Sequence, residues 1–289
     1  MYKKSNRWII IIFLGLSVVA FLGLSLVPLF GALLSNSNPS TPNEIASDSA
    51  PESPYKQIQD EAKGYELVLE REPENPTALR GLVEARLQLI SVGLSDVQEL
   101  LDPLDKLARL NPQQTQYTVL LAQVQQQAGD PEAAATSYRN ILATQPGNLE
   151  ALQGYVALLL QQQRPTYAIE VLQSTIETAP QANQLQPGSV NVPAIQLLKG
   201  QVYVAQQDYA QALELYDRLI AENPQDFRPV YAKAVVLKEQ GQSDQAQALF
   251  SQAVALAPAQ YKDQIQATAQ QSAPATPPPA TPSTEEGPE

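Results

Sequence analysis

The chain has 289 residues, of which 44% are hydrophobic, and its formal net charge at pH 7 is −12. It contains no histidine and no cysteine, which excludes thiol nucleophiles, Ser-His-Asp triads, structural zinc sites and covalent haem attachment. The acidic balance argues against nucleic acid as a partner, and the sequence has no glycine-rich phosphate-binding motif. We therefore expect no enzymatic activity, no cofactor and no small-molecule substrate.

An uncharged apolar segment lies at residues 8–34, directly after three basic side chains within residues 1–7. About 26 apolar residues at ~1.5 Å per residue suffice to cross a hydrocarbon core of ~30 Å. We predict a single transmembrane helix in contact with the lipid bilayer, because a cleavable signal peptide, the alternative, has an apolar region of only about 7–15 residues. No Lys or Arg follows before residue 56, so the positive-inside rule places residues 1–7 in the cytoplasm and the remainder across the membrane.

Five prolines follow a regular period in the rest of the chain. Pro112, Pro146 and Pro180 are spaced by 34 residues, as are Pro224 and Pro258. Twelve positions before four of these prolines stands an alanine, and eight positions before them stands a large side chain: Ala134 and Tyr138, Ala168 and Leu172, Ala212 and Tyr216, Ala246 and Phe250. A small residue lets a neighbouring helix approach, and the large residue four positions later fills the space beside it. The period therefore indicates helical hairpins that stack to bury their apolar faces, with these side chains as packing residues.

The second helices of these units resemble those of the tetratricopeptide repeat (TPR) family. DYAQALELYDRLIAENP at 208–224 and QAQALFSQAVALAP at 245–258 fit the family pattern A-x3-F/Y-x2-A/L-x4-P, and Gly200 with Tyr203 fits the G-x2-Y of first helices. The resemblance implies an all-α fold, a TPR-type helical-hairpin solenoid of about five repeats with capping helices, behind the N-terminal transmembrane helix. It implies repeats at 76–114, 115–148, 149–182, 193–226 and 227–260.

The solenoid is expected to extend from 54 to 271, with segments around the repeats that we assign from their pattern. Apolar residues at i, i+4 spacing predict an N-terminal capping helix at 55–73, and a C-terminal capping helix is expected at 260–271. Ten additional residues at 183–192 are expected to form a polar loop between the third and fourth repeats. Each repeat proline, Pro180 included, is expected to end its helix.

Two segments are predicted to be disordered because their composition offers too few large apolar side chains to fold. The segment 35–53 is rich in Ser, Pro and Asn and is predicted to form a tether. The segment 272–289 is rich in Pro and Glu and is predicted to form an acidic tail.

The TPR resemblance also implies which residues meet a partner, because the family binds other proteins mainly through a concave wall built by its first helices. The positions that carry over as candidate partner-binding residues are Arg80, Glu84, Gln123, Gln127, Gln153, Gln201, Arg228, Tyr231 and Lys238. The same wall includes Gln88, Gln116, Gln126, Glu150, Gln161 and Glu239. Glutamine both donates and accepts hydrogen bonds, so this wall suits an extended peptide backbone. The alternative interpretation is that these positions are solvated helix faces.

Arg228, Tyr231 and Lys238 combine an aromatic ring with two cations, and such side chains are over-represented among residues that dominate binding energy. We therefore predict the main partner contact here, with an acidic segment or a C-terminal carboxylate as the ligand. The alternative is that Tyr231 packs on the neighbouring unit while both cations are solvated. The Lys/Asn clamp with which some TPR proteins hold acidic chaperone tails is missing, which argues against a co-chaperone.

The combination of an anchor, a tether and a TPR domain resembles the ancillary TPR subunit of the bacterial Sec translocon and the membrane-bound TPR assembly factors of cyanobacteria and plastids. This resemblance implies a single-pass membrane protein with its TPR domain on the periplasmic or thylakoid-lumen side. It implies a scaffold that helps to assemble exported or membrane protein complexes, photosynthetic complexes among them. The alternative is a fixed structural subunit of an envelope machine such as a pilus, a secretion apparatus or a cytochrome-maturation apparatus.

Overall fold

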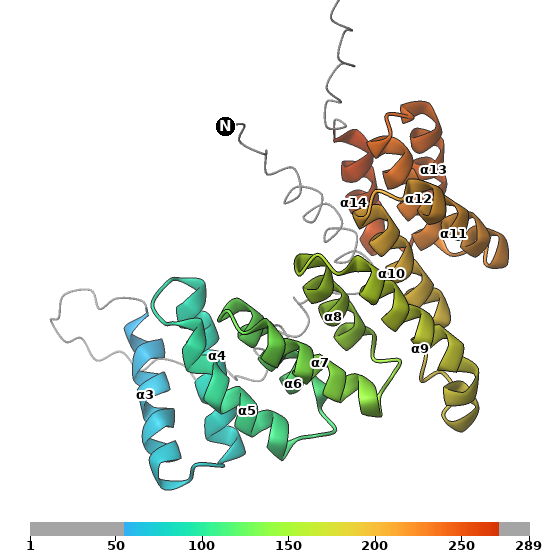
Figure 1. The fold of residues 1–289 in the computed structure, drawn as a ribbon. Coiled ribbons are helices and arrows are strands. Elements are labelled where there is room, and N and C mark those ends of the chain that lie inside the picture. Colours follow the sequence, from blue (N-terminus) through green and yellow to red (C-terminus); the bar gives the residue numbers. More distant parts are fainter. Residues whose placement is uncertain (1–54, 272–289) are drawn as a thin grey trace, which may run out of the picture. The chain divides into compact units, whose positions relative to one another are not determined.

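The structure, a computed structural model, describes residues 55–271. The predicted transmembrane helix at 8–34, the basic segment 1–7, the tether at 35–53 and the tail at 272–289 lie outside the described residues. The described part contains twelve α-helices, one short 3-10 helix and no strand, as the all-α prediction requires (Figure 1). None of the helices in this part is both long enough and apolar enough to cross a membrane.

The chain divides into two compact units, the first ending at Ala205 and the second beginning at Gln206. The described elements of the first unit are α3 (Lys56–Arg71), α4 (Pro76–Ser91), the 3-10 helix η1 (Val97–Leu100), α5 (Leu101–Leu110), α6 (Thr115–Gln127), α7 (Pro131–Thr144), α8 (Leu149–Gln161), α9 (Pro165–Leu185) and α10 (Val192–Ala205). Those of the second unit are α11 (Tyr209–Glu222), α12 (Phe227–Glu239), α13 (Ser243–Leu256) and α14 (Ala259–Gln270). Consecutive helices pack as hairpins, namely α4 on α5, α6 on α7 and α8 on α9 in the first unit and α12 on α13 in the second.

Short polar side chains begin many of these helices. Asn75, Asp130 and Asn148 in the first unit accept hydrogen bonds from backbone N–H groups of the first helical turn. Asp208 and Asp226 do the same in the second unit. These contacts satisfy amide groups that have no partner inside their helix, so the repeated Asn and Asp positions fix where α4, α7, α8, α11 and α12 start.

The turn between the two helices of a repeat has a left-handed residue at its centre. Gly129 and Gly241 hold this position with φ values of 88° and 77°, and the equivalent residues Gln163 and Gln207 have φ values of 59° and 63°. Glycine adopts this conformation without a steric penalty, whereas a residue with a Cβ pays one. The left-handed backbone conformation therefore persists even where the sequence provides a glutamine.

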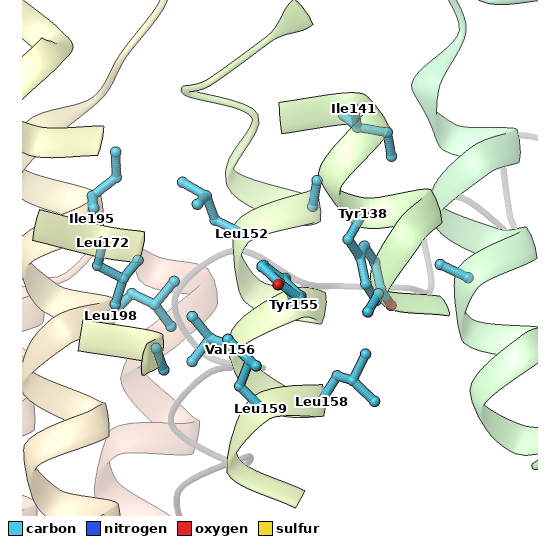
Figure 2. Packing of buried hydrophobic residues seen from close by; sticks show 14 of the residues in the cluster. Tyr138, Ile141, Leu152, Tyr155, Val156, Leu158, Leu159, Leu172, Ile195 and Leu198 are labelled. Atoms are coloured by element: carbon cyan, nitrogen blue, oxygen red, sulfur yellow. The ribbon is translucent and has the colours of Figure 1, made fainter. Parts of the chain in front are cut away.

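The core of the first unit runs through α7, α8, α9 and α10. Figure 2 shows Tyr138 of α7 on one side of α8, facing Tyr155 at 6.3 Å between ring centroids. On the other side of α8, Leu172 of α9 and Ile195 of α10 pack into the same buried cluster. Gly154 makes room for Tyr138, because a Cβ on this glycine would lie 2.5 Å from the tyrosine ring.

The signature side chains of the repeats are buried as the sequence pattern predicts. All four alanines and all four large side chains paired with them are at most 1% exposed, namely Ala134, Tyr138, Ala168, Leu172, Ala212, Tyr216, Ala246 and Phe250. Their predicted role as packing residues is confirmed. The first repeat has Leu100 and Leu104 at these positions, and both are buried as well.

The segment after the third repeat differs from the prediction. Pro180 does not end its helix, since α9 continues to Leu185 and so occupies the first residues of the predicted loop at 183–192. Loss of one backbone hydrogen bond and the ring clash at a mid-helix proline cost about 3 kcal/mol. Packing beyond the proline offsets this cost, because Ala182 contacts the buried cluster.

The loop that follows α9 is fixed by hydrogen bonds and by packing against the core. The side chain of Asn183 accepts a hydrogen bond from Val190 N at 2.8 Å and donates one to Val190 O at 2.9 Å. Val190 is 3% exposed and belongs to the core cluster of the first unit. The backbone at Ser189 approaches Gly147 so closely that a Cβ there would lie 2.0 Å from the Ser189 carbonyl oxygen. The predicted polar loop is therefore shorter than expected and contributes an apolar side chain to the core.

Candidate partner-binding surface

The first helices of the second, third and fourth repeats lie next to each other in the first unit, since α6 contacts α8 and α8 contacts α10. Their candidate residues are Gln123 and Gln127 on α6, Gln153 on α8 and Gln201 on α10. The two neighbouring wall glutamines Gln126 and Gln161 form a hydrogen bond between α6 and α8, with Nε2 of Gln126 donating to Oε1 of Gln161. The structure therefore places candidate amide side chains on adjacent helices.

The candidate glutamines differ in their access to solvent. Gln127 is exposed and Gln123 is half-buried, whereas Gln153 and Gln201 are 6% and 7% exposed. Both amide atoms of Gln201 are buried without a hydrogen-bond partner among the described residues. A buried amide without a partner destabilises a fold by roughly 1–3 kcal/mol. Gln201 therefore holds hydrogen-bonding capacity that residues 55–271 do not use.

Glu150 stands on α8 beside these glutamines, and burial raises the pKa of its carboxyl group above the ordinary value. Its negative charge adds to the effect of burial on Tyr138, whose pKa is also raised. The Tyr138 hydroxyl has no hydrogen-bond partner among the described residues. This part of the first unit thus combines a partly desolvated carboxylate with an unsatisfied hydroxyl.

Arg80 and Glu84 are one turn apart on α4. The Arg80 side chain is exposed and donates from Nε to the Pro76 carbonyl oxygen at 3.2 Å. Burial raises the pKa of Glu84, and the nearby positive charge of Arg80 opposes this shift. The pair therefore presents one accessible cation and one half-buried carboxyl group.

In the second unit, Arg228 is held by the residue that caps its own helix. Its guanidinium donates to Asp226 from Nε at 2.9 and 3.1 Å and from Nη2 at 2.6 Å, while Asp226 also accepts from the Arg228 amide. Burial alone would raise the pKa of Asp226, but these hydrogen bonds lower it below the ordinary value. The charge of Arg228 is therefore compensated inside the repeat.

Tyr231 and Lys238 are covered by α14, the last of the described helices. Tyr231 is 3% exposed, packs edge-on against Phe250 at 5.9 Å and donates its hydroxyl to Thr268 Oγ1 at 3.2 Å. The Lys238 ammonium donates to the Thr268 carbonyl oxygen and lies 5.8 Å from the centroid of the Phe250 ring. Burial lowers the pKa of Lys238.

The predicted cluster of Arg228, Tyr231 and Lys238 thus lies on one helix, but it is not an open cationic and aromatic surface. The alternative, in which Tyr231 packs on the neighbouring unit and both cations are solvated, agrees with the structure only in that Tyr231 is packed. Its partners include Phe250 of the same repeat and Thr268 of α14, and both cations have protein partners. The sequence predicted a capping helix at 260–271, which α14 matches, but it did not show that this helix covers the face through Tyr261, Ile265 and Thr268. Their spacing of four and three residues on one helix was the available signal.

Neither unit offers a metal-binding site within the described residues, where no group of three or more His, Cys, Asp or Glu side chains gathers. The polar chemistry of the candidate surface is therefore that of amides, hydroxyls and single charges. Such groups can donate and accept hydrogen bonds.

Residues 85–258 match the family model described as Tetratricopeptide repeat. The cellulose synthase operon protein C of Pseudomonas fluorescens (strain SBW25) is 29% identical over 143 residues, which cover 49% of this chain and 11% of that protein. The chain thus spans about a tenth of the length of this curated relative.

Solved structures with similar helices include a tetratricopeptide repeat protein from Parabacteroides merdae ATCC 43184, with 14% identity and a TM-score of 0.46 over 74% of this chain and 77% of that one. Yeast Tom70 is 16% identical with a TM-score of 0.49, over 72% of this chain and 42% of its own.

Proposed function

Because the chain belongs to the tetratricopeptide repeat family, we propose that it is a scaffold for protein–protein interactions. The observation that carries the proposal is that exposed or half-buried glutamines, Gln123 and Gln127 of α6 and Gln161 of α8, lie on two first helices that contact each other. TPR folds are typically non-enzymatic, in keeping with a scaffold. The partner-binding residues that we propose are the nine candidates on the first helices, from Arg80 to Lys238.

We further propose that the scaffold is a single-pass membrane protein. In this proposal, residues 8–34 lie in the lipid bilayer, residues 1–7 face the cytoplasm, and the repeats lie on the periplasmic or thylakoid-lumen side. The support comes from the uncharged segment and from the basic residues on only one side of it. Protease added to right-side-out vesicles should then degrade the repeats, and full protection of the repeats would contradict this orientation.

Within this setting, we propose an assembly or biogenesis factor for exported or membrane protein complexes. A fixed structural subunit of an envelope machine is the second candidate, and the similarity to a protein named after a cellulose synthase operon favours it. Crosslinking with mass spectrometry in the native membrane separates the two. An assembly factor gives substoichiometric contacts with several maturing proteins, whereas a subunit gives a fixed ratio to one set of neighbours.

The binding surface is tested by replacing accessible wall glutamines. We expect the variant with Gln123→Ala, Gln127→Ala and Gln161→Ala to capture its crosslinked partners far less, because three lost hydrogen bonds of about 1 kcal/mol each lower affinity on the order of 100-fold. The matched control carries Gln211→Ala, Gln247→Ala and Gln252→Ala, which are exposed positions on the second helices α11 and α13. Equal capture by the wall variant and the unmodified chain would place the binding surface elsewhere.

A further inference from the structure

The helix α14 packs along α13 and also reaches one face of α12 through three side-chain contacts. The Tyr261 ring stacks on the Phe227 ring with centroids 5.4 Å apart and planes at 29°. Thr268 accepts a hydrogen bond from the Tyr231 hydroxyl at 3.2 Å, and its carbonyl oxygen accepts one from the Lys238 ammonium. Between these two contacts, the Ile265 side chain is fully buried.

We propose that this face of α12 is a docking site for a helix of a partner protein, and that α14 occupies the site until such a helix displaces it. The proposal rests on the proposed function of this chain as a scaffold, in which Arg228, Tyr231 and Lys238 contact the partner. The proposal adds that the partner contacts these residues with an amphipathic helix rather than with an extended peptide.

The contacts of α14 define the chemistry of the partner helix. Tyr261, Ile265 and Thr268 are spaced by four and three residues, so they form one stripe on the helix. A partner helix needs an aromatic residue for Phe227, a branched aliphatic residue four positions later, and a hydroxyl residue three positions further for Tyr231. Thr268 already donates its hydroxyl to the Gln264 carbonyl oxygen at 2.9 Å, so it is free to accept from Tyr231.

Lys238 fixes the direction of the bound helix. Thr268 lies in the last turn of α14, where carbonyl oxygens have no partner inside the helix and the helix dipole is negative. The ammonium of Lys238 satisfies one of these carbonyl groups. The partner helix must therefore end close to Lys238, with its C-terminal carbonyls or a carboxylate directed at this cation.

The structure also indicates that α14 is the helix most easily displaced from the second unit. Ile265 is the one buried residue of α14, whereas α12 contributes a set of nine: Phe227, Pro229, Val230, Tyr231, Ala232, Ala234, Val235, Val236 and Leu237. The N-terminus of α14 begins after Pro258 and has no side-chain cap. Helices with few buried contacts at the end of an array open at lower free energy than those in its interior.

The test uses the full-length chain and a fluorescein-labelled synthetic peptide with the sequence of residues 258–271. Ile265→Asp in the chain loosens α14 but leaves the face of α12 unchanged, so the peptide should bind this variant at least about tenfold more tightly than it binds the unmodified chain. Gln266→Asp is the matched control, because this neighbouring position of α14 is exposed and should leave peptide binding as in the unmodified chain. A peptide that itself carries the aspartate in place of isoleucine should bind neither chain.

Equal peptide binding to the unmodified and Ile265→Asp chains would overturn the proposal, as would absent binding to an Ile265→Asp chain that retains its helical circular dichroism.

Hydrogen exchange of the unmodified chain provides a second measurement that needs no variant. The amides of α14 should exchange faster than those of α12 and α13, and simultaneous exchange of all three helices would overturn the proposal. If the chain forms a concentration-dependent dimer and the added peptide dissociates it, the face of α12 binds a second copy of this chain. That result would overturn the proposal of a partner helix. Since no native partner is used, these outcomes are independent of the capture experiment on the wall glutamines.

Discussion

At the scale of single residues, the repeats tolerate side chains that their local environment does not favour. Gln201 keeps a buried amide without a partner among the described residues, although an aliphatic side chain would avoid this cost. Gln163 and Gln207 adopt a left-handed backbone where Gly129 and Gly241 occupy the equivalent turns. Such local conflicts are expected where a side chain serves binding rather than stability, and they are also places where stability is easily raised.

We predict that Gln163→Gly stabilises the protein. The left-handed conformation costs a residue with a Cβ roughly 1–2 kcal/mol, and the greater freedom of glycine in the unfolded chain offsets part of this gain, so we expect a net increase of about 0.5–1 kcal/mol in unfolding free energy. Chemical denaturation measures the difference. Gln162→Gly is the control, because Gln162 has a φ of −76° and should lose stability on replacement. A loss of stability in Gln163→Gly would contradict the role assigned to the turn.

At the scale of elements, the segment from α9 to α10 shows how packing overrides local signals. Pro180 predicts a helix end, yet α9 continues to Leu185 because the turn beyond it contacts the core. The short loop that follows is fixed at Asn183 and at Val190, which lie seven residues apart. The backbone of this loop can lie against Gly147 only because glycine has no Cβ.

We predict that Gly147→Ala destabilises the first unit by about 1–3 kcal/mol, because the new Cβ meets the backbone carbonyl of Ser189 and the loop must shift. Thermal unfolding and hydrogen exchange of the Val190 amide would show the change. Gly64→Ala on α3 is the matched control, since a Cβ there meets nothing within 4 Å and should raise helix stability by about 0.5–1 kcal/mol. Unchanged protection of Val190 in Gly147→Ala would show that the loop is not held at this position.

At the scale of the whole molecule, the balance of carboxyl groups sets how stability depends on pH. Burial raises the pKa of Glu84, Glu150 and Glu239 above 4.5, so the folded chain bears a cost for their charged forms at neutral pH. Asp226 behaves in the opposite way, because its hydrogen bonds with Arg228 lower its pKa below 3.8 despite its burial. The net charge of −12 adds repulsion that also weakens as carboxylates become protonated.

We therefore predict a stability maximum on the acidic side of neutrality. Between pH 7 and about 4.5 the raised carboxyl groups take up protons more readily in the folded chain, which increases the free energy of unfolding. Below about pH 3.8 protonation removes the contribution of Asp226, so stability falls again. Thermal unfolding between pH 7.5 and pH 3 measures this profile.

The double variant Glu150→Gln and Glu239→Gln tests the cause of this profile, because glutamine keeps the shape of the side chain without a titrating group. In this variant the increase in unfolding free energy between pH 7 and pH 5 should be smaller, and the decrease in unfolding free energy at lower pH should be unchanged. A melting temperature of the unmodified chain that falls steadily from pH 7 to pH 5 would contradict the prediction.

The sequence by itself determined the repeat architecture of the described residues. A period of 34 residues with an alanine and a large side chain at fixed offsets specifies which faces are buried, because these positions recur on one side of each second helix. The burial of Ala134, Tyr138 and their equivalents follows directly from this local pattern. Caps such as Asp130 and Asn148 could be read from the sequence for the same reason, since their partners lie within one helical turn.

Only the tertiary structure decided which candidate residues remain accessible. Lys238 and Thr268 are 30 residues apart, and Asn183 closes a loop whose shape depends on Gly147 of a different repeat. Contacts of this kind depend on how one helix lies on another, which a periodic pattern along the chain does not specify. For the same physical reason, the sequence did not show that α9 continues past Pro180 or that Tyr231 is buried beneath α14.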